Sequence, residues 1–215
     1  MIKAVIFDMD GTICDTIEDL ATATNYAMQE LGFPAHTIDE YKYMVGNGIP
    51  NLIYKALPED KKDMKEKARE IMLSYYKDHF ADKTYPYDGI IPMLNALKEQ
   101  GFRLAVCTNK AHHMALVVAE KFFDRFFEIV YGQREGHPLK PDPAQALEIL
   151  DTFGLAPAET LFVGDSGVDM QTAKNLGAVA VGVEWGFRTA DELKENGADY
   201  IVSAPQDILE IIKGI

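Results

Sequence analysis

Alternation between strand-like and helix-like segments is the feature of this sequence that most restricts its fold. Short apolar, β-branched segments are separated by segments of helical periodicity, several of which end at a glycine. The expected strands are Ile2–Phe7, Arg103–Cys107, Phe127–Tyr131, Leu161–Val163, Val179–Val183 and Tyr200–Val202. Alternation of this kind predicts an α/β fold with a parallel sheet and helices on both of its faces.

One stretch of the chain interrupts this alternation. Residues 16–82 carry helical patterns but no strand pattern. A stripe from Ile17 to Leu31 predicts a first helix, and Thr37–Glu40 has the form of a capping box at the start of a second. Glu59–Phe80 predicts a further helix, whose inward residues would be Met64, Ala68, Ile71, Met72 and Tyr75. We therefore predict two domains: an α/β core of residues 1–15 and 83–215, and an all-helical domain of residues 16–82 inserted after the first strand.

Charge and composition restrict the partners. The chain has 215 residues and a formal net charge of −13. Such an acidic chain repels nucleic acids and anionic membranes, so neither is expected as a partner. No apolar run approaches the roughly 20 residues of a membrane span. The two cysteines, Cys14 and Cys107, are far apart and form no CxxC motif, which favours reduced thiols in a cytoplasmic protein.

Polar residues follow four of the expected strands. They are Asp8, Asp10, Gly11 and Thr12 after the first, Thr108 and Asn109 after the second, Lys140 in the loop after the third, and Asp165 with Asp169 after the fourth. The carboxyl ends of parallel strands share one edge of a sheet, where ligands bind in such folds. Four carboxylates at one edge would repel each other unless a cation lay among them. Oxygen ligands without nearby His or Cys favour Mg²⁺.

These motifs resemble those of the haloacid dehalogenase superfamily. The resemblance rests on the DxDGT sequence at Asp8–Thr12, on Thr108, on Lys140 before a proline, and on the GDSxxD sequence at Gly164–Asp169. The motifs occur in the family's order and span nearly the whole chain. The resemblance implies a Rossmann-like core with an alpha-helical cap domain at residues 16–82.

The resemblance also implies roles for the carboxylates. Asp8 would be the nucleophile that forms an aspartyl-phosphate. Asp10 would be the general acid for the leaving group and then the general base for water. The metal ligands would be Asp8, Asp10 through its backbone carbonyl, and Asp165, while Asp169 would act through water or orient Lys140.

The remaining motif residues would bind phosphate. Gly11 would let the chain turn sharply as it leaves the sheet. Thr108 and Asn109 would cradle the phosphoryl oxygens, and Lys140 would pair with the nucleophile and the phosphate. Together they imply a Mg²⁺-dependent hydrolase that acts on a small anionic phosphorylated metabolite.

The second carboxylate of the first motif bears on the reaction class. A halide leaves without a proton and without a metal, so Asp10, Asp165 and Asp169 favour phosphoryl transfer over cleavage of a carbon–halogen bond. Val45–Pro50 and Trp185–Arg188 are similar to segments of phosphoglycolate phosphatases. The leading substrate is therefore 2-phosphoglycolate, although the chain departs from that subgroup's usual pattern at Asp88 and at residues 133–137.

Three alternatives stay open at this point. A phosphosugar mutase would need cap cations to hold a bisphosphate, and Arg69 is the only arginine in residues 16–82. A pyrophosphatase of the same fold shares parts of the motifs. A non-catalytic domain phosphorylated on an aspartate would need neither the helical insert nor Asp10. The sequence also does not decide whether the protein is a monomer or a homodimer. Nor does it decide whether the substrate contacts any of five basic residues, which are Lys110, His112, His113, Arg134 and Arg188.

Overall fold

The computed structural model describes residues 1–215 and contains a six-stranded sheet in the order β5–β4–β1–β6–β7–β8. All neighbouring strands of this sheet are parallel. The strands are β1 (Ala4–Phe7), β4 (Arg103–Ala111), β5 (Ile129–Gln133), β6 (Thr160–Gly164), β7 (Val179–Val183) and β8 (Tyr200–Val202). The chain lays down β4 and β5 on one side of β1 and the last three strands on the other. The strand order therefore reverses at β1, where α/β sheets bind their ligands.

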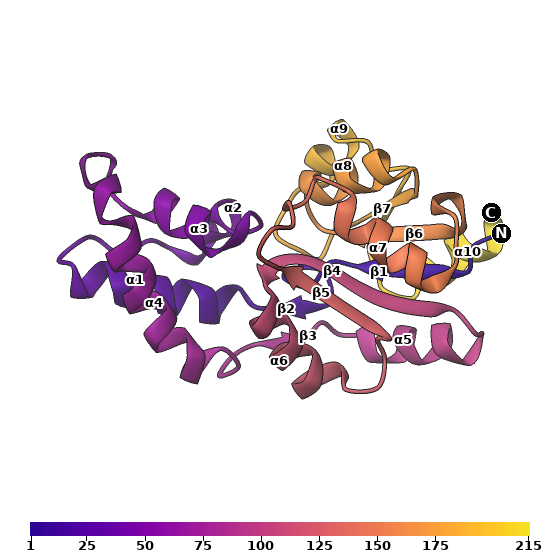
Figure 1. Ribbon diagram of the computed structural model, residues 1–215, viewed down its shortest axis with the longest axis horizontal. Coiled ribbons are helices and arrows are strands. Elements are labelled where there is room, and N and C mark those ends of the chain that lie inside the picture. The colour runs from indigo at the N-terminus through magenta and orange to yellow at the C-terminus, as the bar shows by residue number, and fades with distance from the viewer.

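Helices cover both faces of the sheet, as the alternation predicted (Figure 1). One face carries α5 (Ile90–Glu99), α6 (His112–Phe123) and α10 (Asp207–Gly214), and the other carries α7 (Ala144–Phe153), α8 (Gly167–Leu176) and α9 (Ala190–Glu195). A short 3₁₀ helix, η2 (Pro157–Glu159), precedes β6. Successive residues of β1 serve the two layers in turn: Val5 and Phe7 pack under α5 and α6, whereas Ala4 and Ile6 pack under α7 and α8.

The insert forms a separate group of helices at one end of the molecule, opposite both chain termini (Figure 1). It contains α1 (Ile17–Glu30), α2 (Ile38–Met44), α3 (Gly48–Ala56), the 3₁₀ helix η1 (Glu59–Met64) and α4 (Lys65–His79). We call these elements the helical lobe. The capping box expected at Thr37 is confirmed, with the Glu40 N–H donating to the Thr37 hydroxyl and the Thr37 N–H donating to the Glu40 carboxylate. The lobe has its own hydrophobic cluster, which Met114 and Phe187 of the sheet side also join.

Two adjacent strands connect the lobe to the sheet. β2 (Cys14–Asp15) leads into the lobe, β3 (Tyr85–Pro86) leads out of it, and the two pair antiparallel. The buried carboxylate of Asp19, in the first turn of α1, accepts hydrogen bonds from the backbone N–H groups of Lys83 and Thr84 and from the Thr84 hydroxyl. The returning chain is thereby tied to the start of α1.

The expectation of one helix over Glu59–Phe80 was wrong. The segment divides into η1 and α4, with a non-helical residue at Lys61. Tyr75 was expected to face inward, but it is partly exposed and stacks on Tyr26, and the buried residue is Tyr76. Tyr76 follows Met72 by four residues, so it continues the buried stripe that Ala68 and Met72 begin.

Strand boundaries also differ from the expected ones. β1 begins two residues later than predicted, β5 is displaced to Ile129–Gln133, and β6 is longer at both ends. The largest difference is in β4, which continues beyond Cys107 to Ala111. Its register with β5 shifts between Cys107 and Ala111, so Thr108, Asn109 and Lys110 lie in an irregular stretch of a strand. Such irregularities often re-aim side chains beside active sites.

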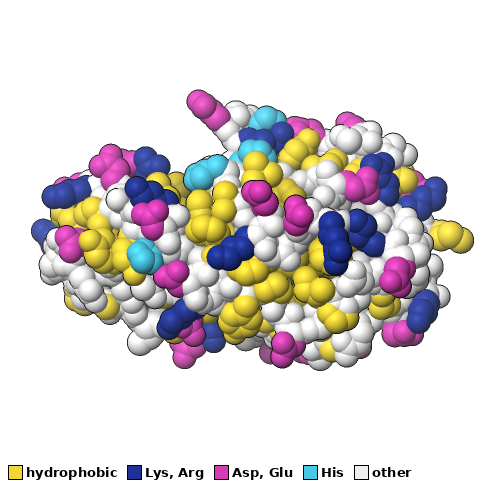
Figure 2. Space-filling view, turned by 90° about the horizontal axis from the view of Figure 1, so that it is seen from below, with side chains coloured by type: hydrophobic (Ala, Val, Ile, Leu, Met, Phe, Trp, Pro, Cys, Tyr) yellow, Lys and Arg dark blue, Asp and Glu magenta, His cyan; other side chains and the backbone are white.

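The surface mixes charges of both signs. On the face that carries α5 and α6, acidic and basic side chains are interspersed among apolar ones (Figure 2). This face therefore presents no large field of a single sign. No helix combines the length and apolarity that crossing a membrane requires.

Candidate active site

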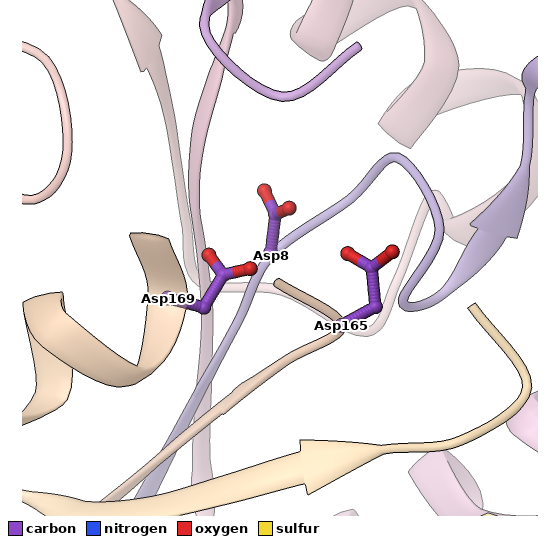
Figure 3. A group of neighbouring side chains, drawn as sticks. All are labelled: Asp8, Asp165 and Asp169. Carbon is purple, nitrogen blue, oxygen red and sulfur yellow. The ribbon is translucent and has the colours of Figure 1, made fainter. Parts of the chain in front are cut away.

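Three carboxylates meet at the carboxyl edge of the sheet. Asp8 follows β1, Asp165 follows the neighbouring strand β6, and Asp169 lies in the first turn of α8. One oxygen from each lies within 4.8 Å of the others, and all three residues are buried. Figure 3 shows Asp8 between the other two, with the three carboxylates on the same side. The pairing of β1 with β6 thus brings together residues that are more than 150 positions apart.

Burial makes the negative charge of these groups unfavourable. It raises the pKa of Asp8 to about 6, with Asp169 and Asp10 adding to the rise and Lys140 opposing it. Burial also raises the pKa of Asp165 well above its usual value, and the charges of Asp169 and Asp8 act in the same direction. The negative charge of the three carboxylates therefore exceeds the positive charge that nearby basic side chains supply.

Lys140 is the cation closest to the cluster. Its Nζ lies 2.8 Å from Asp8 Oδ1 and 2.6 Å from Asp169 Oδ1. Burial alone would lower the pKa of Lys140, but the charges of Asp169 and Asp8 raise it above the usual value, so the side chain is an ammonium ion. Asn109 holds the backbone on both sides of this lysine, since its Oδ1 accepts from Lys140 N at 2.8 Å and its Nδ2 donates to Lys140 O at 3.2 Å.

The cluster fits a hard divalent cation. Asp8 Oδ1 is buried and has no directed hydrogen bond, despite its closeness to the Lys140 ammonium. Asp165 is held by the Phe187 N–H at 2.7 Å and is 3.4 Å from the Thr12 hydroxyl. Three buried carboxylates with oxygens within 4.8 Å of one another form the kind of donor set that Mg²⁺ or a similar ion binds. Gly11 is required here, because its φ is +88° and an added Cβ would lie 2.3 Å from Asp165 Oδ2.

Asp10 has a different partner from the three clustered carboxylates. Its two oxygens lie 3.0 and 3.3 Å from Lys110 Nζ, and the same ammonium lies 3.0 Å from the hydroxyl of Tyr76. Burial alone would lower the pKa of Lys110, but Asp10 raises it above the usual value. The sequence left the role of Lys110 open and did not single out Tyr76. The four-residue spacing of Ala68, Met72 and Tyr76 on one helix face is the only sequence signal that could have indicated Tyr76.

A small cavity lies between these side chains and the helical lobe. Its volume is about 30 Å³, roughly enough for two water molecules. The sheet side contributes Asp8, Asp10, Thr108, Asn109 and Lys110, and the lobe contributes Leu20, Val45, Gly46, Gly48, Ile49 and Leu52. Lys110 is the only cation among these residues, and the wall formed by the lobe is apolar. The lobe is closed onto the sheet, where Asn109 Nδ2 donates to Gly46 O at 3.1 Å and Arg188 donates to Val45 O at 2.9 Å.

Comparison with known proteins identifies the family. A family model described as haloacid dehalogenase-like hydrolase matches residues 5–183. The chain belongs to this family. It is 32% identical over 218 residues to the phosphoglycolate phosphatase of Chromobacterium violaceum, covering 99% of this chain and 97% of that protein. It is 36% identical over 223 residues to the phosphoglycolate phosphatase of Nitrosospira multiformis, covering 99% and 96%. The crystal structure of a predicted phosphoglycolate phosphatase from Haemophilus somnus superposes with a TM-score of 0.90 at 29% identity, covering 98% of both chains.

The other residues considered from the sequence do not line the cavity of this hydrolase. Arg134 pairs with Glu148, Arg188 pairs with Glu192 and contacts the lobe, and His113 is exposed. The ring of His112 accepts a hydrogen bond from Gly132 N through Nδ1. Both cysteines are buried, and burial raises the pKa of each thiol, which suits packing rather than reaction.

Proposed function

We propose that this hydrolase is a Mg²⁺-dependent phosphatase that cleaves a small phosphomonoester through an aspartyl-phosphate at Asp8. The observation that carries the proposal is the buried Asp8 carboxylate, whose oxygen Oδ1 lacks a directed hydrogen bond and lies 2.8 Å from Lys140 Nζ. We further propose that residues 16–82 act as a cap domain over a core formed by residues 1–15 and 83–215.

In this mechanism an Asp8 oxygen attacks phosphorus, and the bond from phosphorus to the ester oxygen breaks. Asp10 gives a proton to the departing alkoxide. It then takes a proton from the water that attacks phosphorus and frees Asp8. Lys140 balances the charge of Asp8 and of the phosphoryl oxygens, with Thr108 and Asn109 as further contacts. Asp169 orients Lys140 through the 2.6 Å contact.

The metal would be held by the carboxylates of Asp8 and Asp165 and by the backbone carbonyl of Asp10. A bound Mg²⁺ would supply positive charge against the phosphate, so that a carboxylate can approach it. The raised pKa of Asp8 and of Asp165 supports this assignment, because burial and the neighbouring carboxylates both disfavour their negative charge and a cation would offset that penalty.

We propose 2-phosphoglycolate as the substrate, cleaved to glycolate and phosphate. The name of the two curated relatives supports this choice. So does the charge of the cavity lining, whose single cation, Lys110, could meet one carboxylate. A hexose bisphosphate or pyrophosphate carries a second phosphate, which one lysine already bonded to Asp10 and Tyr76 would balance poorly. Arg69, the lobe's only arginine, instead pairs with Glu66 at 2.8 Å and does not line the cavity.

The test is phosphate release from a panel of esters with and without Mg²⁺, with Asp8→Asn as the control. The panel holds 2-phosphoglycolate, pyrophosphate, glucose 1-phosphate, nucleoside monophosphates and p-nitrophenyl phosphate. The proposal predicts at least a tenfold preference for 2-phosphoglycolate, about 1.4 kcal/mol in the barrier. Broad weak activity would reject this substrate but not the phosphatase. Conversion of glucose 1-phosphate to the 6-phosphate, with a bisphosphate primer, would indicate a mutase instead.

A further inference from the structure

A buried chain of polar contacts joins the helical lobe to Asp10. Tyr76 lies on α4 of the lobe, Lys110 lies on β4 of the sheet, and Asp10 lies in the loop after β1. The Tyr76 hydroxyl is 3.0 Å from Lys110 Nζ, which is 3.0 Å from Asp10 Oδ1 and 3.3 Å from Asp10 Oδ2. Tyr76 is 1% exposed and Lys110 is 6% exposed, so water does not compete freely for these contacts.

The charge states fix the direction of these hydrogen bonds. Burial raises the pKa of Tyr76, so the side chain is a neutral phenol. Lys110 is an ammonium ion with three donors and no acceptor. Lys110 therefore donates both to the Tyr76 oxygen and to the Asp10 carboxylate. Two partners, one in the lobe and one on the sheet side, define the position of the ammonium, which is otherwise the end of a long flexible side chain.

Only one of the three residues belongs to the lobe. Asp10 and Lys110 are on the sheet side, so their contact does not depend on the position of the lobe. The contact of Lys110 with Tyr76 exists only when the lobe is packed on the sheet. The same holds for the hydrogen bonds from Asn109 to Gly46 and from Arg188 to Val45. A closure that seals the cavity thus also adds the second partner of Lys110.

We propose that Tyr76 is a positioning residue, which fixes Lys110 against Asp10 when the lobe closes and so orients the Asp10 carboxyl group, protonated for this step, for proton transfer to the leaving group. This inference rests on the function proposed above, in which Asp10 is the acid. It assigns to a lobe residue, remote from phosphorus, an effect on one step of the reaction.

The test compares two substrates with leaving groups of different basicity. An alkyl phosphate such as 2-phosphoglycolate needs a proton on its leaving oxygen, whereas p-nitrophenolate leaves without one. Well-placed acid catalysis contributes roughly a hundredfold or more, and misplacement removes part of that. Tyr76→Phe is therefore expected to lower kcat/KM for the alkyl phosphate by about tenfold. It should lower kcat/KM for p-nitrophenyl phosphate by less than about threefold, because that step draws little on the acid.

Tyr41→Phe is the matched control. Tyr41 is also a buried tyrosine of the lobe, but its hydroxyl donates to Asn25 Oδ1 at 2.7 Å and it does not line the cavity. This variant likewise removes the hydrogen bond of a buried lobe tyrosine, here one to a neutral amide, so a general loosening of the lobe would show in both variants. We expect Tyr41→Phe to change neither substrate's kcat/KM by more than about twofold, an allowance for indirect effects.

Further variants decide the outcome. In an Asp10→Asn background Tyr76→Phe should have no additional effect, since the residue that it positions has lost its proton transfer. Should Tyr76→Phe fail to fold, Lys110→Met must produce the same unequal losses when the alkyl phosphate carries no carboxylate, because Lys110 is also the proposed partner of the glycolate carboxylate. Equal losses for both substrates, or a Tyr76→Phe enzyme with the activity of wild type, would overturn the inference on Tyr76. The proposed function would stand in that case, provided that wild type is active and that Asp10→Asn has lost most of this activity. A wild-type protein that releases phosphate from neither ester would refute the proposed function and this inference with it.

Discussion

Removal of the Asp19 carboxylate tests how the lobe is attached to the sheet. The side chain accepts hydrogen bonds from Lys83 N at 3.0 Å, Thr84 N at 2.8 Å and the Thr84 hydroxyl at 2.8 Å. Hydrogen bonds to a charged group contribute about 1.5–3 kcal/mol each, and those that share one carboxylate are not additive. Asp19→Ala leaves buried donors without an acceptor, so we expect it to lower the free energy of unfolding by about 3 kcal/mol.

Equilibrium unfolding in urea measures this loss, and a thermal scan should show a fall of roughly 6–12 °C in Tm at this chain length. Near- and far-UV circular dichroism should be recorded together, because the lobe has a hydrophobic cluster of its own and could unfold separately. Glu18→Ala is the matched control: its half-exposed carboxylate pairs with Lys83 Nζ at 2.7 Å, and it should cost less than about 1 kcal/mol. An Asp19→Ala loss no larger than that of Glu18→Ala would refute the reasoning.

Four further predictions concern the active site. Asp8→Asn should lower turnover by roughly a thousandfold or more while the circular dichroism spectrum stays that of wild type; an active variant, free of contaminating phosphatase, would reject Asp8 as nucleophile. Mg²⁺ at a hundredfold excess over its Kd should stabilise the fold by about 2.7 kcal/mol, and chelation should stop activity that Ca²⁺ restores poorly. Burial raises the folded-state pKa of Asp8 to about 6, so the contribution of Asp8 to the stability of the metal-free protein grows as the pH falls through 6. Protons then compete with Mg²⁺ for this carboxylate, and the rise in Tm that Mg²⁺ causes should be smaller at pH 5 than at pH 7. Gly11→Ala should abolish activity, because the Cβ would overlap Asp165; normal kinetics of this variant would contradict the tight packing of that loop.

The fold and the edge of the sheet that bears the site followed from local patterns in the sequence. Strand-like runs such as Ala4–Phe7 lie between two helix layers, so every residue is apolar, and the pattern is strong. The rule that parallel strands end at one edge was enough to place Asp8 and Asp165 at the same edge of the sheet, whereas their closeness comes from the pairing of β1 with β6. These inferences depend on periodicity and chain order, which a single sequence contains.

What the sequence did not reveal depends on contacts between distant segments. Tyr75 and Tyr76 are adjacent and of one residue type, and apart from the four-residue spacing after Met72 it is the packing of α4 on α1 that decides which is buried. The role of Lys110, which lies in the irregular stretch of β4, depends on its contacts with Asp10 and with a lobe residue 34 positions earlier. The boundary between η1 and α4, at Met64 and Lys65, falls in a run of charged residues without a proline or glycine to indicate it.

The most direct test of the account is a search for a phosphoryl group on Asp8. Asp10→Asn enzyme is mixed with p-nitrophenyl phosphate and Mg²⁺, quenched in acid, and digested for mass spectrometry. This substrate needs no acid to form the aspartyl-phosphate, and the variant lacks the base that would hydrolyse it. The account predicts a phosphoryl group on the peptide that contains Asp8, and none when Asp8 is also replaced by Asn. Wild-type turnover with no phosphoryl group on Asp8 in the quenched variant, or with the group on another residue, would contradict it.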